Sequence, residues 1–342
     1  MASNRFDLIR LVLASVVFLY HAVVLSAFAR GTPLEPALGK AAEFAIQGFF
    51  IVSGALVAGS LARSDSLVDF AGKRVRRLYP AYAVVILIPA MISLLVSGDI
   101  AGVGKYLAAN LVFLNFLSPN LPGLFEDNRF TEVNGALWTL KIEVMFYLVL
   151  PAIVWLLKRL GRYHWAGLGL LYAAGEMWRL YLPVVSVPGL PPEIAHQLPS
   201  QMAFFASGIA FWQVWSAARS RPGLFGLVGI GLLILSELHP ALEPFRAAGL
   251  AGVIAFIAFA PGPSLNAARF GDISYGVYIT HFPILQGLVM AGAFAALGVG
   301  AALTLSVALV VAASFLLWHL VERPALRPSS HYRKVADIQS EG

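Results

Sequence analysis

Cysteine is absent from the 342-residue chain, and charged residues are scarce. Without cysteine, the chain can form no disulfide, no thiolate nucleophile and no Cys-ligated metal site, and its redox compartment stays undetermined. Charged residues make up 12% of the chain and hydrophobic residues 59%, whereas charged residues make up roughly 25% of a typical soluble domain. Apolar runs recur at the length that spans a bilayer. The composition therefore predicts an all-α, polytopic transmembrane helical bundle.

The first apolar run does not have the features of a signal peptide, and the net charge does not indicate a nucleic-acid partner. No small-residue cleavage pattern follows that run, so we expect it to be retained as a helix rather than removed as a signal peptide. The formal net charge is +6, but basic residues of a membrane protein serve topology and contacts with anionic lipid first. We therefore expect membrane lipid as a partner and no nucleic acid.

Hydropathy divides the chain into ten apolar segments, and the first three are close to the ~20 residues that a bilayer requires. A further apolar run, 105–117, is shorter and is followed by a stretch with two prolines, which favours an interfacial or re-entrant helix over a spanning one. The predicted spans are 6–28, 41–61, 78–97, 135–157, 164–182, 198–216, 224–238, 246–260, 273–293 and 301–320.

The distribution of Lys and Arg decides whether the short run crosses the membrane. If it does not cross, about 17 of the 24 basic residues fall on one side, which the positive-inside rule assigns to the cytoplasm. We therefore predict about ten spans, both termini in the cytoplasm and an extracytoplasmic excursion over 98–134. Residues 1–328 form one membrane-embedded domain in this prediction, and 329–342 form a short cytoplasmic tail.

The first predicted helix carries two ionisable side chains, Arg10 and His21. Their separation of eleven positions corresponds to roughly 16 Å and about three turns, so both lie near one face. Ionisable groups inside a spanning helix are costly and usually face a protein interior or a wet cavity, which makes them candidates for a functional site. The alternative is that Arg10 reaches the lipid headgroups and His21 bonds a neighbouring helix.

Four cations occupy the five positions Lys73–Arg77, before the third predicted span. Arg74 and Arg77 lie three positions apart and share a face if the helix begins early, and their planar guanidinium groups then suit phosphate oxygens. This pattern predicts a phosphate site. The alternative is that the cluster sets topology and contacts anionic lipid.

Glu143 lies well inside its predicted span and needs a partner. Lys141, two positions away, points elsewhere on the helix, so the partner has to come from another helix. We expect it to be His21, because a carboxylate that orients an imidazole also raises its basicity. A purely structural role for Glu143 is the alternative.

Three other patterns carry weaker expectations. Asp272 is placed to cap the helix over 273–293, and His281 is either a bonded packing residue or part of the site. The small residues of 47–54 favour close helix packing. His319 and Glu322 form half of a helical metal site whose other half is missing, so we expect no metal.

Taken in order, these motifs resemble the acyltransferase 3 family of integral-membrane O-acyltransferases, which are bacterial enzymes that modify surface polysaccharides. Each motif is weak by itself, but the ordered set is specific and runs almost from end to end. The motifs are Arg10 with His21, the run Phe49–Gly54, Arg74 and Arg77 before Leu78–Pro80, Trp138–Leu140 with Glu143 and Tyr147, Ser274 and Tyr275 with His281, and Glu322–Pro324.

The resemblance implies a multi-pass protein of the bacterial cytoplasmic (inner) membrane with about ten helices. It implies an acyl-CoA donor, such as acetyl-CoA, reached from the cytoplasm, and a carbohydrate or lipid-linked glycan acceptor. On this basis we expect Arg10 and His21 to be essential. Arg10, Arg74 and Arg77 are assigned to the CoA donor, and Tyr275 and His281 to the substrate.

Two mechanisms and one competing class remain open at this stage. In the first mechanism, Glu143 holds His21, which takes the proton of a sugar hydroxyl as that oxygen attacks the thioester. In the second, His21 is itself acylated and relays the group. The competing class is a transporter or flippase that uses Arg10, His21 and Glu143 as a substrate or proton relay. The acceptor sugar, the acyl group and the oligomeric state stay open.

Overall fold

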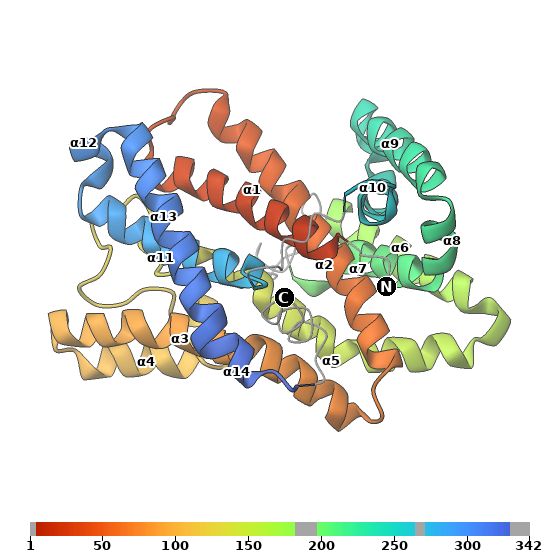
Figure 1. The fold of residues 1–342 in the computed structure, drawn as a ribbon, viewed down its shortest axis with the longest axis horizontal. Coiled ribbons are helices and arrows are strands. Elements are labelled where there is room, and N and C mark those ends of the chain that lie inside the picture. Colours follow the sequence, from red (N-terminus) through yellow and green to blue (C-terminus); the bar gives the residue numbers. More distant parts are fainter. Residues whose placement is uncertain (1–4, 182–196, 264–270, 329–342) are drawn as a thin grey trace. The chain divides into compact units, whose positions relative to one another are not determined.

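The computed structural model describes residues 5–181, 197–263 and 271–328, and every regular element in them is a helix (Figure 1). No strand occurs in this part of the chain. The all-α prediction is therefore confirmed for the described residues. The predicted cytoplasmic tail, 329–342, lies outside them.

Ten of the helices correspond to the ten predicted spans. Within the described residues, six segments are long and apolar enough to cross a membrane, so the prediction of about ten spans is not confirmed. The six are Phe6–Ser26, Leu34–Ala62, Leu67–Ser97, Gly135–Arg159, Pro240–Phe259 and Val299–Ala325. The ten helices are α1 (Phe6–Ser26), α2 (Leu34–Ala62), α3 (Leu67–Ser97), α5 (Trp138–Arg159), α6 (His164–Tyr181), α7 (Leu198–Gln213), α9 (Pro222–Leu238), α10 (Arg246–Phe259), α11 (Ser274–Met290) and α13 (Val299–Leu317).

Shorter elements connect these helices, and α4 (Ile100–Asn110) is the one expected near 105–117. The Asp99 side chain caps it by accepting a hydrogen bond from Gly102 N. Its 11 residues extend ~16 Å, about half of the ~30 Å hydrocarbon core, so α4 by itself cannot span a bilayer. The other short elements are α8 (Trp215–Ser220), α12 (Ala293–Leu297), α14 (Arg323–Ala325), the 3₁₀ turns η1 (Asn115–Leu117), η2 (Gly135–Leu137), η3 (Gly161–Tyr163) and η5 (Pro240–Phe245), and the π-helical turn η7 (Trp318–Glu322).

Helix α3 begins well before its apolar stretch, which hydropathy placed at 78. It starts at Leu67 and continues through Pro80. The difference arises because Lys and Arg lower hydropathy but are good helix formers. The basic run Lys73–Arg77 therefore lies on the helix and not in a loop, and Arg74 and Arg77 share one face of it.

The chain divides into two compact units that interleave in sequence. Unit 1 comprises Met1–Ile9, Ile46–Ala71 and Ile142–Leu265, and unit 2 comprises Arg10–Ala45, Gly72–Lys141 and Asn266–Gly342. The single membrane domain over 1–328 stays a prediction.

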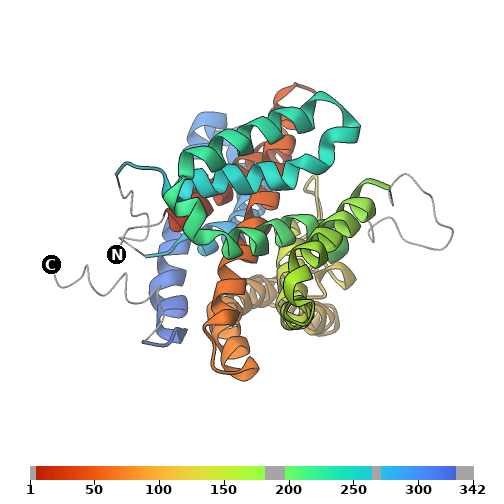
Figure 2. The ribbon, with the colours of Figure 1, turned by 90° about the vertical axis from the view of Figure 1, so that its right-hand side faces the viewer.

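In unit 1, helices pack closely where glycines face one another. Helices α9 and α10 lie side by side (Figure 2), and a Cβ on Gly229 would come within 2.6 Å of Val253 N. Gly54 of α2 meets Gly208 of α7 in the same way, since a Cβ on Gly208 would lie 2.8 Å from Gly54 Cα. The close packing expected for the small residues of 47–54 is therefore confirmed.

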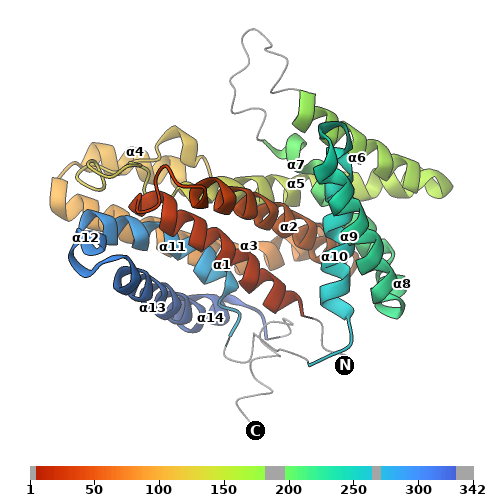
Figure 3. The same cartoon turned by 90° about the horizontal axis from the view of Figure 1, so that it is seen from above.

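In unit 2, α11 lies against α13 (Figure 3). Gly276 of α11 permits this contact, because a Cβ there would lie 2.8 Å from Ser314 Cα. Helix α3 holds the end of α4, since the buried Tyr82 hydroxyl donates to the Asn110 carbonyl at 2.6 Å. These contacts hold α11 against α13 and α3 against α4.

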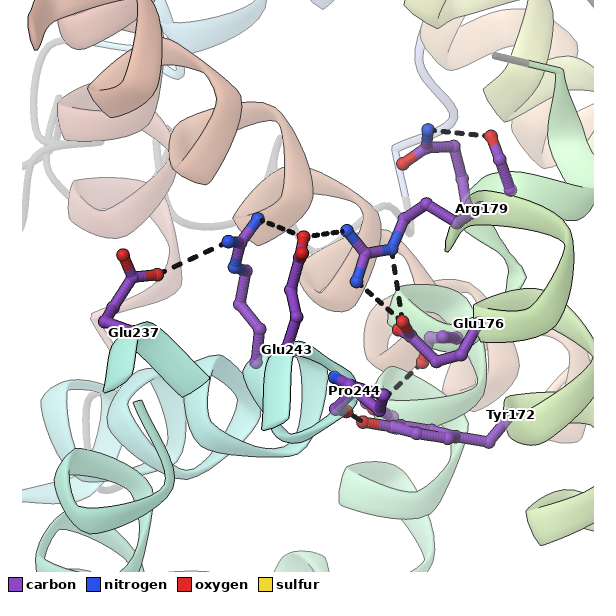
Figure 4. A network of polar contacts seen from close by, with 11 residues as sticks. Tyr172, Glu176, Arg179, Glu237, Glu243 and Pro244 are labelled. Atoms are coloured by element: carbon purple, nitrogen blue, oxygen red, sulfur yellow. Dashed lines mark hydrogen bonds and ion pairs between the residues drawn. The ribbon is translucent and has the colours of Figure 1, made fainter. Parts of the chain in front are cut away.

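A network of ion pairs joins α6 to the α9–α10 pair in unit 1 (Figure 4). Arg179 binds Glu176 and Glu243 at 2.6 Å each. Arg246 binds Glu243 at 3.2 Å and Glu237 at 3.3 Å. This network is not predicted from the sequence, because its members are spread over three helices and a turn and only their assembly reveals the pairing.

Removal of the Arg179 cation is expected to destabilise unit 1. Arg179→Met leaves the Glu176 carboxylate, which is 5% exposed, without its counter-ion, and breaking a buried pair in this way costs about 3–5 kcal/mol. Thermal unfolding of the purified protein measures the loss. Arg219→Met, at an exposed position, is the matched control. Equal unfolding temperatures for the two variants would contradict the role given to the network.

Candidate functional site

Arg10 and Arg77 lie in unit 2 together with two carboxylates, and the four side chains form one buried ion cluster. Arg10 donates to Asp272 Oδ2 at 2.9 Å. Arg77 donates to the same oxygen and to Glu322 Oε2, at 2.5 Å each. Two positive and two negative charges cancel, which is the condition under which buried charges are tolerated.

Asp272, two positions before the start of α11, is the residue on which both guanidinium groups converge. Burial by itself would raise the pKa of Asp272, but the charges of Arg10 and Arg77 lower it to about 2. The Ser274 hydroxyl donates to the other carboxylate oxygen at 2.6 Å. Asp272 is therefore ionised at physiological pH. Its predicted role as a helix cap is wrong, because α11 begins without a side-chain cap and the carboxylate binds the arginines instead.

Glu322 reaches Arg77 from the π-helical turn η7, which follows α13. Such turns change the register of a helix and often occur at functional sites. Two aromatic rings also face the cation, since the Arg77 guanidinium carbon lies 5.6 Å from the Tyr275 ring centroid and 5.8 Å from that of Trp318. The Tyr275 hydroxyl donates to the Leu78 carbonyl at 2.9 Å. Arg77 is thus held by α3, α11 and η7 together.

Arg10 and Arg77 were predicted site residues, but the role of their carboxylate partners was not predicted. Asp272 was expected to cap a helix, and Glu322 to be half of an incomplete metal site. The usable signal was the predicted topology, because it places the start of the 273–293 span and the end of the 301–320 span on the same side as the two arginines. Carboxylates at those ends were therefore available to balance the charge.

Arg74 lies one turn before Arg77 on α3 and is half-buried. The terminal nitrogens of Arg77 bond Asp272 and Glu322, so its nearest ligands in the structure are carboxylates and not a phosphate. The assignment of Arg10, Arg74 and Arg77 to the CoA donor stays a prediction.

His21 of α1 faces His281 of α11, and their contacts determine where the protons lie. His21 Nδ1 is 2.9 Å from His281 Nε2, and His281 Nδ1 is 3.0 Å from the Val277 carbonyl oxygen. A carbonyl oxygen only accepts, so a neutral His281 carries its proton on Nδ1 and accepts at Nε2. His21 Nδ1 then donates to it, which leaves the lone pair of His21 on Nε2. Nε2 is then the nitrogen of His21 that can accept a proton.

Aromatic rings enclose the two imidazoles. The Phe282 ring centroid lies 5.1 Å from that of His21, and the Phe18 ring meets His281 edge to face at 6.2 Å. His281 is fully buried. The bond to a neighbouring helix that was the alternative role for His21 is therefore present, and it leaves His21 Nε2 available for chemistry because it uses only Nδ1.

Glu143 belongs to unit 1 and has its own partners there. Its carboxylate accepts a hydrogen bond from Ser53 Oγ at 2.8 Å and another from the Tyr147 hydroxyl. Ser53, Glu143 and Tyr147 belong to two of the ordered motifs, and the structure brings them together. Because His21 lies in the other unit, the pairing of Glu143 with His21 stays a prediction.

Tyr275 and His281, which were assigned to the substrate, are both buried beside other predicted site residues. Tyr275 packs on Arg77, and His281 bonds His21. Their contact with substrate stays a prediction. His319 Nδ1 lies 2.9 Å from the Phe315 carbonyl, and no group of three or more His, Cys, Asp or Glu side chains in the described segments is placed to hold a metal ion.

The chain is similar in sequence to several curated proteins. Nodulation protein 10 of Rhizobium leguminosarum bv. viciae is 29% identical, over 95% of this chain and 93% of that protein. The O-acetyl transferase of Shigella phage Sf6 is 27% identical, over 96% of this chain and 97% of that protein. Peptidoglycan O-acetyltransferase OatA of Listeria monocytogenes is 26% identical, over 69% of this chain and 44% of that protein. No solved structure matches the chain.

A family match covers nearly the whole chain. The family of the acyltransferase domain matches residues 3–319. That range contains both His21 and His281, the ion-cluster residues Arg10, Arg77 and Asp272, and the motif around Glu143. The match therefore includes most of the predicted site residues, and the chain belongs to the acyltransferase 3 family.

Proposed function

We propose that this protein transfers an acyl group, acetyl in the simplest case, from acyl-CoA to a hydroxyl group of a cell-surface or lipid-linked carbohydrate. The family supports acyl transfer, and two relatives are O-acetyltransferases by name, one of them acting on peptidoglycan. The observation that carries the proposal is the orientation of His21, whose Nδ1 is bonded to His281 and whose Nε2 is left as a base.

The chemistry follows from that orientation. His21 Nε2 takes the proton of the acceptor hydroxyl while the hydroxyl oxygen attacks the thioester carbonyl carbon. The carbon–sulfur bond then breaks, and the thiolate of CoA receives the proton from the imidazolium. The hydrogen bond from His21 Nδ1 to His281 strengthens as the positive charge forms. General-base assistance of this kind contributes about 10²–10⁴ in rate.

The donor end of the site is assigned to the arginines of α1 and α3. Arg74 supplies a guanidinium group to the phosphates of CoA, because planar guanidinium groups bind phosphate oxygens in a bidentate manner. Arg77 lies one turn further along α3, and Asp272 connects it to Arg10. This ion cluster fixes the position of α3. The donor therefore enters at the Arg10 end of α1 and meets the acceptor near His21.

The direction of two helices supports the proposed topology. Along α1 the chain runs from Arg10 to His21, and along α11 it runs from Asp272 to His281, and the two pairs contact each other at both places. Helices α1 and α11 are therefore parallel, as an even number of crossings between them requires. We propose ten spans in the bacterial inner membrane, with both termini in the cytoplasm and the 98–134 segment outside it.

Removal of the base is expected to abolish turnover without unfolding the protein. His21→Ala lowers acceptor-dependent release of CoA thiol from acetyl-CoA by about 10²–10⁴-fold. His239→Ala, at an exposed position, is the matched control and retains activity. Unchanged turnover in His21→Ala would refute the mechanism. Rapid-quench labelling with radiolabelled acetyl-CoA tests the relay alternative, because only the relay places label on the protein during turnover.

The two arginines of α3 are expected to differ in their effects. Arg74→Ala weakens CoA binding by roughly tenfold or more, because a hydrogen bond to a charged group is worth about 1.5–3 kcal/mol, and lowers thermal stability less than Arg77→Ala does. Arg77→Ala lowers the free energy of unfolding by about 3–5 kcal/mol, because it removes the cation that pairs with the Asp272 and Glu322 carboxylates. Calorimetric CoA titration and thermal unfolding separate the two effects, with the exposed Arg76 substituted by Ala as control. Normal CoA affinity in Arg74→Ala would remove this residue from the donor site.

The group that orients His21 can be identified by comparing variants of its two candidate partners. His281→Leu removes the acceptor for His21 Nδ1, so we expect a lower kcat and a shifted pH dependence of kcat. His281→Gln is expected to restore part of the rate, because its side-chain oxygen can accept the same hydrogen bond.

For Glu143 the test is a double-mutant cycle. If Glu143 acts through His21, Glu143→Gln lowers kcat in the wild-type background and adds nothing in the His21→Ala background. An equal loss in both backgrounds would show that Glu143 does not act through His21.

A further inference from the structure

Unit 2 contains a cavity of about 250 Å³ that lies apart from the ion cluster. It is enclosed by the end of α4, the segment through η1, the segment before η2 and the first turn of α5. Its polar and aromatic lining consists of Asn110, Asn115, Phe116, Glu132, Trp138 and Lys141. None of these side chains belongs to the ion cluster or to the His21–His281 pair.

The charges of the cavity are balanced and accessible. The Glu132 carboxylate forms no hydrogen bond or ion pair with any other described side chain or backbone group. Lys141 Nζ lies 4.7 Å from the Phe116 ring centroid. One carboxylate and one ammonium group therefore face a space whose net charge is zero, which suits a neutral, polar ligand rather than an anion.

A buried acceptor atom also lacks a partner in this cavity. The Asn115 amide nitrogen donates to the Tyr82 hydroxyl at 3.0 Å and to Asn110 Oδ1 at 2.6 Å. Asn115 Oδ1 is buried and has no hydrogen-bond partner among the described residues. Such an atom is costly unless a ligand or water donates to it. The ligand that suits it therefore carries hydroxyl or amide donors.

Aromatic surface completes the lining. Trp138 is 39% exposed and Phe116 is 63% exposed, so both rings offer a face to a ligand. A sugar ring has a face of C–H groups that packs on an aromatic ring and a rim of hydroxyl groups that bond carboxylates, amides and ammonium groups. The volume is below the roughly 300–1,000 Å³ of pockets for drug-sized ligands, which fits one sugar residue and not a longer segment.

The cavity is one side chain away from the base. Gly135 lines it, and a Cβ on Gly135 would lie 2.9 Å from the Phe282 ring. The Phe282 ring in turn contacts His21, with 5.1 Å between their centroids. Asn134, also in the lining, donates to the Ile279 carbonyl at 2.8 Å. The wall of the cavity is thus attached to the turn of α11 that carries His281.

The position of Glu132 is fixed by α11 as well. The Gln286 amide nitrogen donates to the Phe130 carbonyl at 2.7 Å and to the Glu132 carbonyl at 2.8 Å. Asn128 in return donates to Gln286 Oε1 at 2.8 Å. These bonds make the lining a preformed wall, which lowers the entropic cost of binding.

We infer that this cavity binds one neutral sugar residue of the acceptor beside His21. The inference rests on the proposed function and locates part of its acceptor site. Trp138 packs on the sugar face, Glu132 accepts hydrogen bonds from hydroxyl groups, and Lys141 donates to them. Asn115 Oδ1 accepts one more. The charged groups of Glu132 and Lys141 disfavour a lipid chain, and the Glu132 carboxylate disfavours the phosphates of the donor.

The test uses the full chain in nanodiscs with the methyl glycosides of glucose, galactose and N-acetylglucosamine as probes. Saturation-transfer NMR measures glycoside binding, and release of CoA thiol from acetyl-CoA gives KM for glycoside and donor separately. Trp138→Ala is expected to weaken glycoside binding about tenfold, Glu132→Gln severalfold, and neither changes KM for acetyl-CoA. Trp138→Phe restores most of the affinity. Trp155→Ala, at an exposed position of the same helix, is the matched control.

The outcomes separate the cavity from the proposed function. Glycoside affinity that is unchanged in both Trp138→Ala and Glu132→Gln, an effect confined to KM for acetyl-CoA, or no binding of any probe to the wild-type protein would each overturn the cavity assignment. Trp138-dependent binding without thiol release would uphold the cavity and refute the transferase function. Thiol release that depends on His21 but not on Trp138 would uphold the transferase function and overturn the cavity assignment.

Discussion

Arg77 lies between two buried carboxylates, and the arrangement of unit 2 depends on that balance of charge. Helix α3 supplies Arg77, the segment before α11 supplies Asp272, the π-helical turn supplies Glu322, and α1 adds Arg10. Removing any one of the four leaves an uncompensated charge in an environment that cannot solvate it. The cluster therefore holds the first turns of α1, the Arg77 turn of α3, the start of α11 and the turn after α13 at one point.

The position of His21 follows from this constraint. Helices α1 and α11 are parallel and touch twice, once through Arg10 and Asp272 and once through His21 and His281. The first contact is an ion pair that sets the register of one helix against the other. The second, about three turns further along α1, places two imidazoles within hydrogen-bond distance. The ion pair between Arg10 and Asp272 thus aligns the helices so that the imidazoles of His21 and His281 meet.

The two contacts also differ in what they require of their surroundings. The ion cluster needs equal numbers of cations and carboxylates, whereas the imidazole pair needs only a carbonyl oxygen to set its protons. The Val277 carbonyl meets that need from within α11. Phe282 links this pair to a cavity lined by the Glu132 carboxylate and two exposed rings. The imidazole pair and this cavity therefore adjoin, while the ion cluster lies at the other end of α1.

The sequence by itself determined the all-α class, the approximate helix ends and the candidate residues Arg10, His21, Arg77, Glu143 and His281, because hydropathy and the cost of burying ionisable groups are local properties of the chain. It also misjudged local features, placing the start of α3 at 78 and a cap at Asp272. The partners were decided only by the tertiary structure. Arg77 meets Asp272 and Glu322 from 195 and 245 positions away, and His21 meets His281 from 260 positions away. Spacing along one helix cannot indicate which distant groups balance a charge or accept a proton, because that depends on how helices pack.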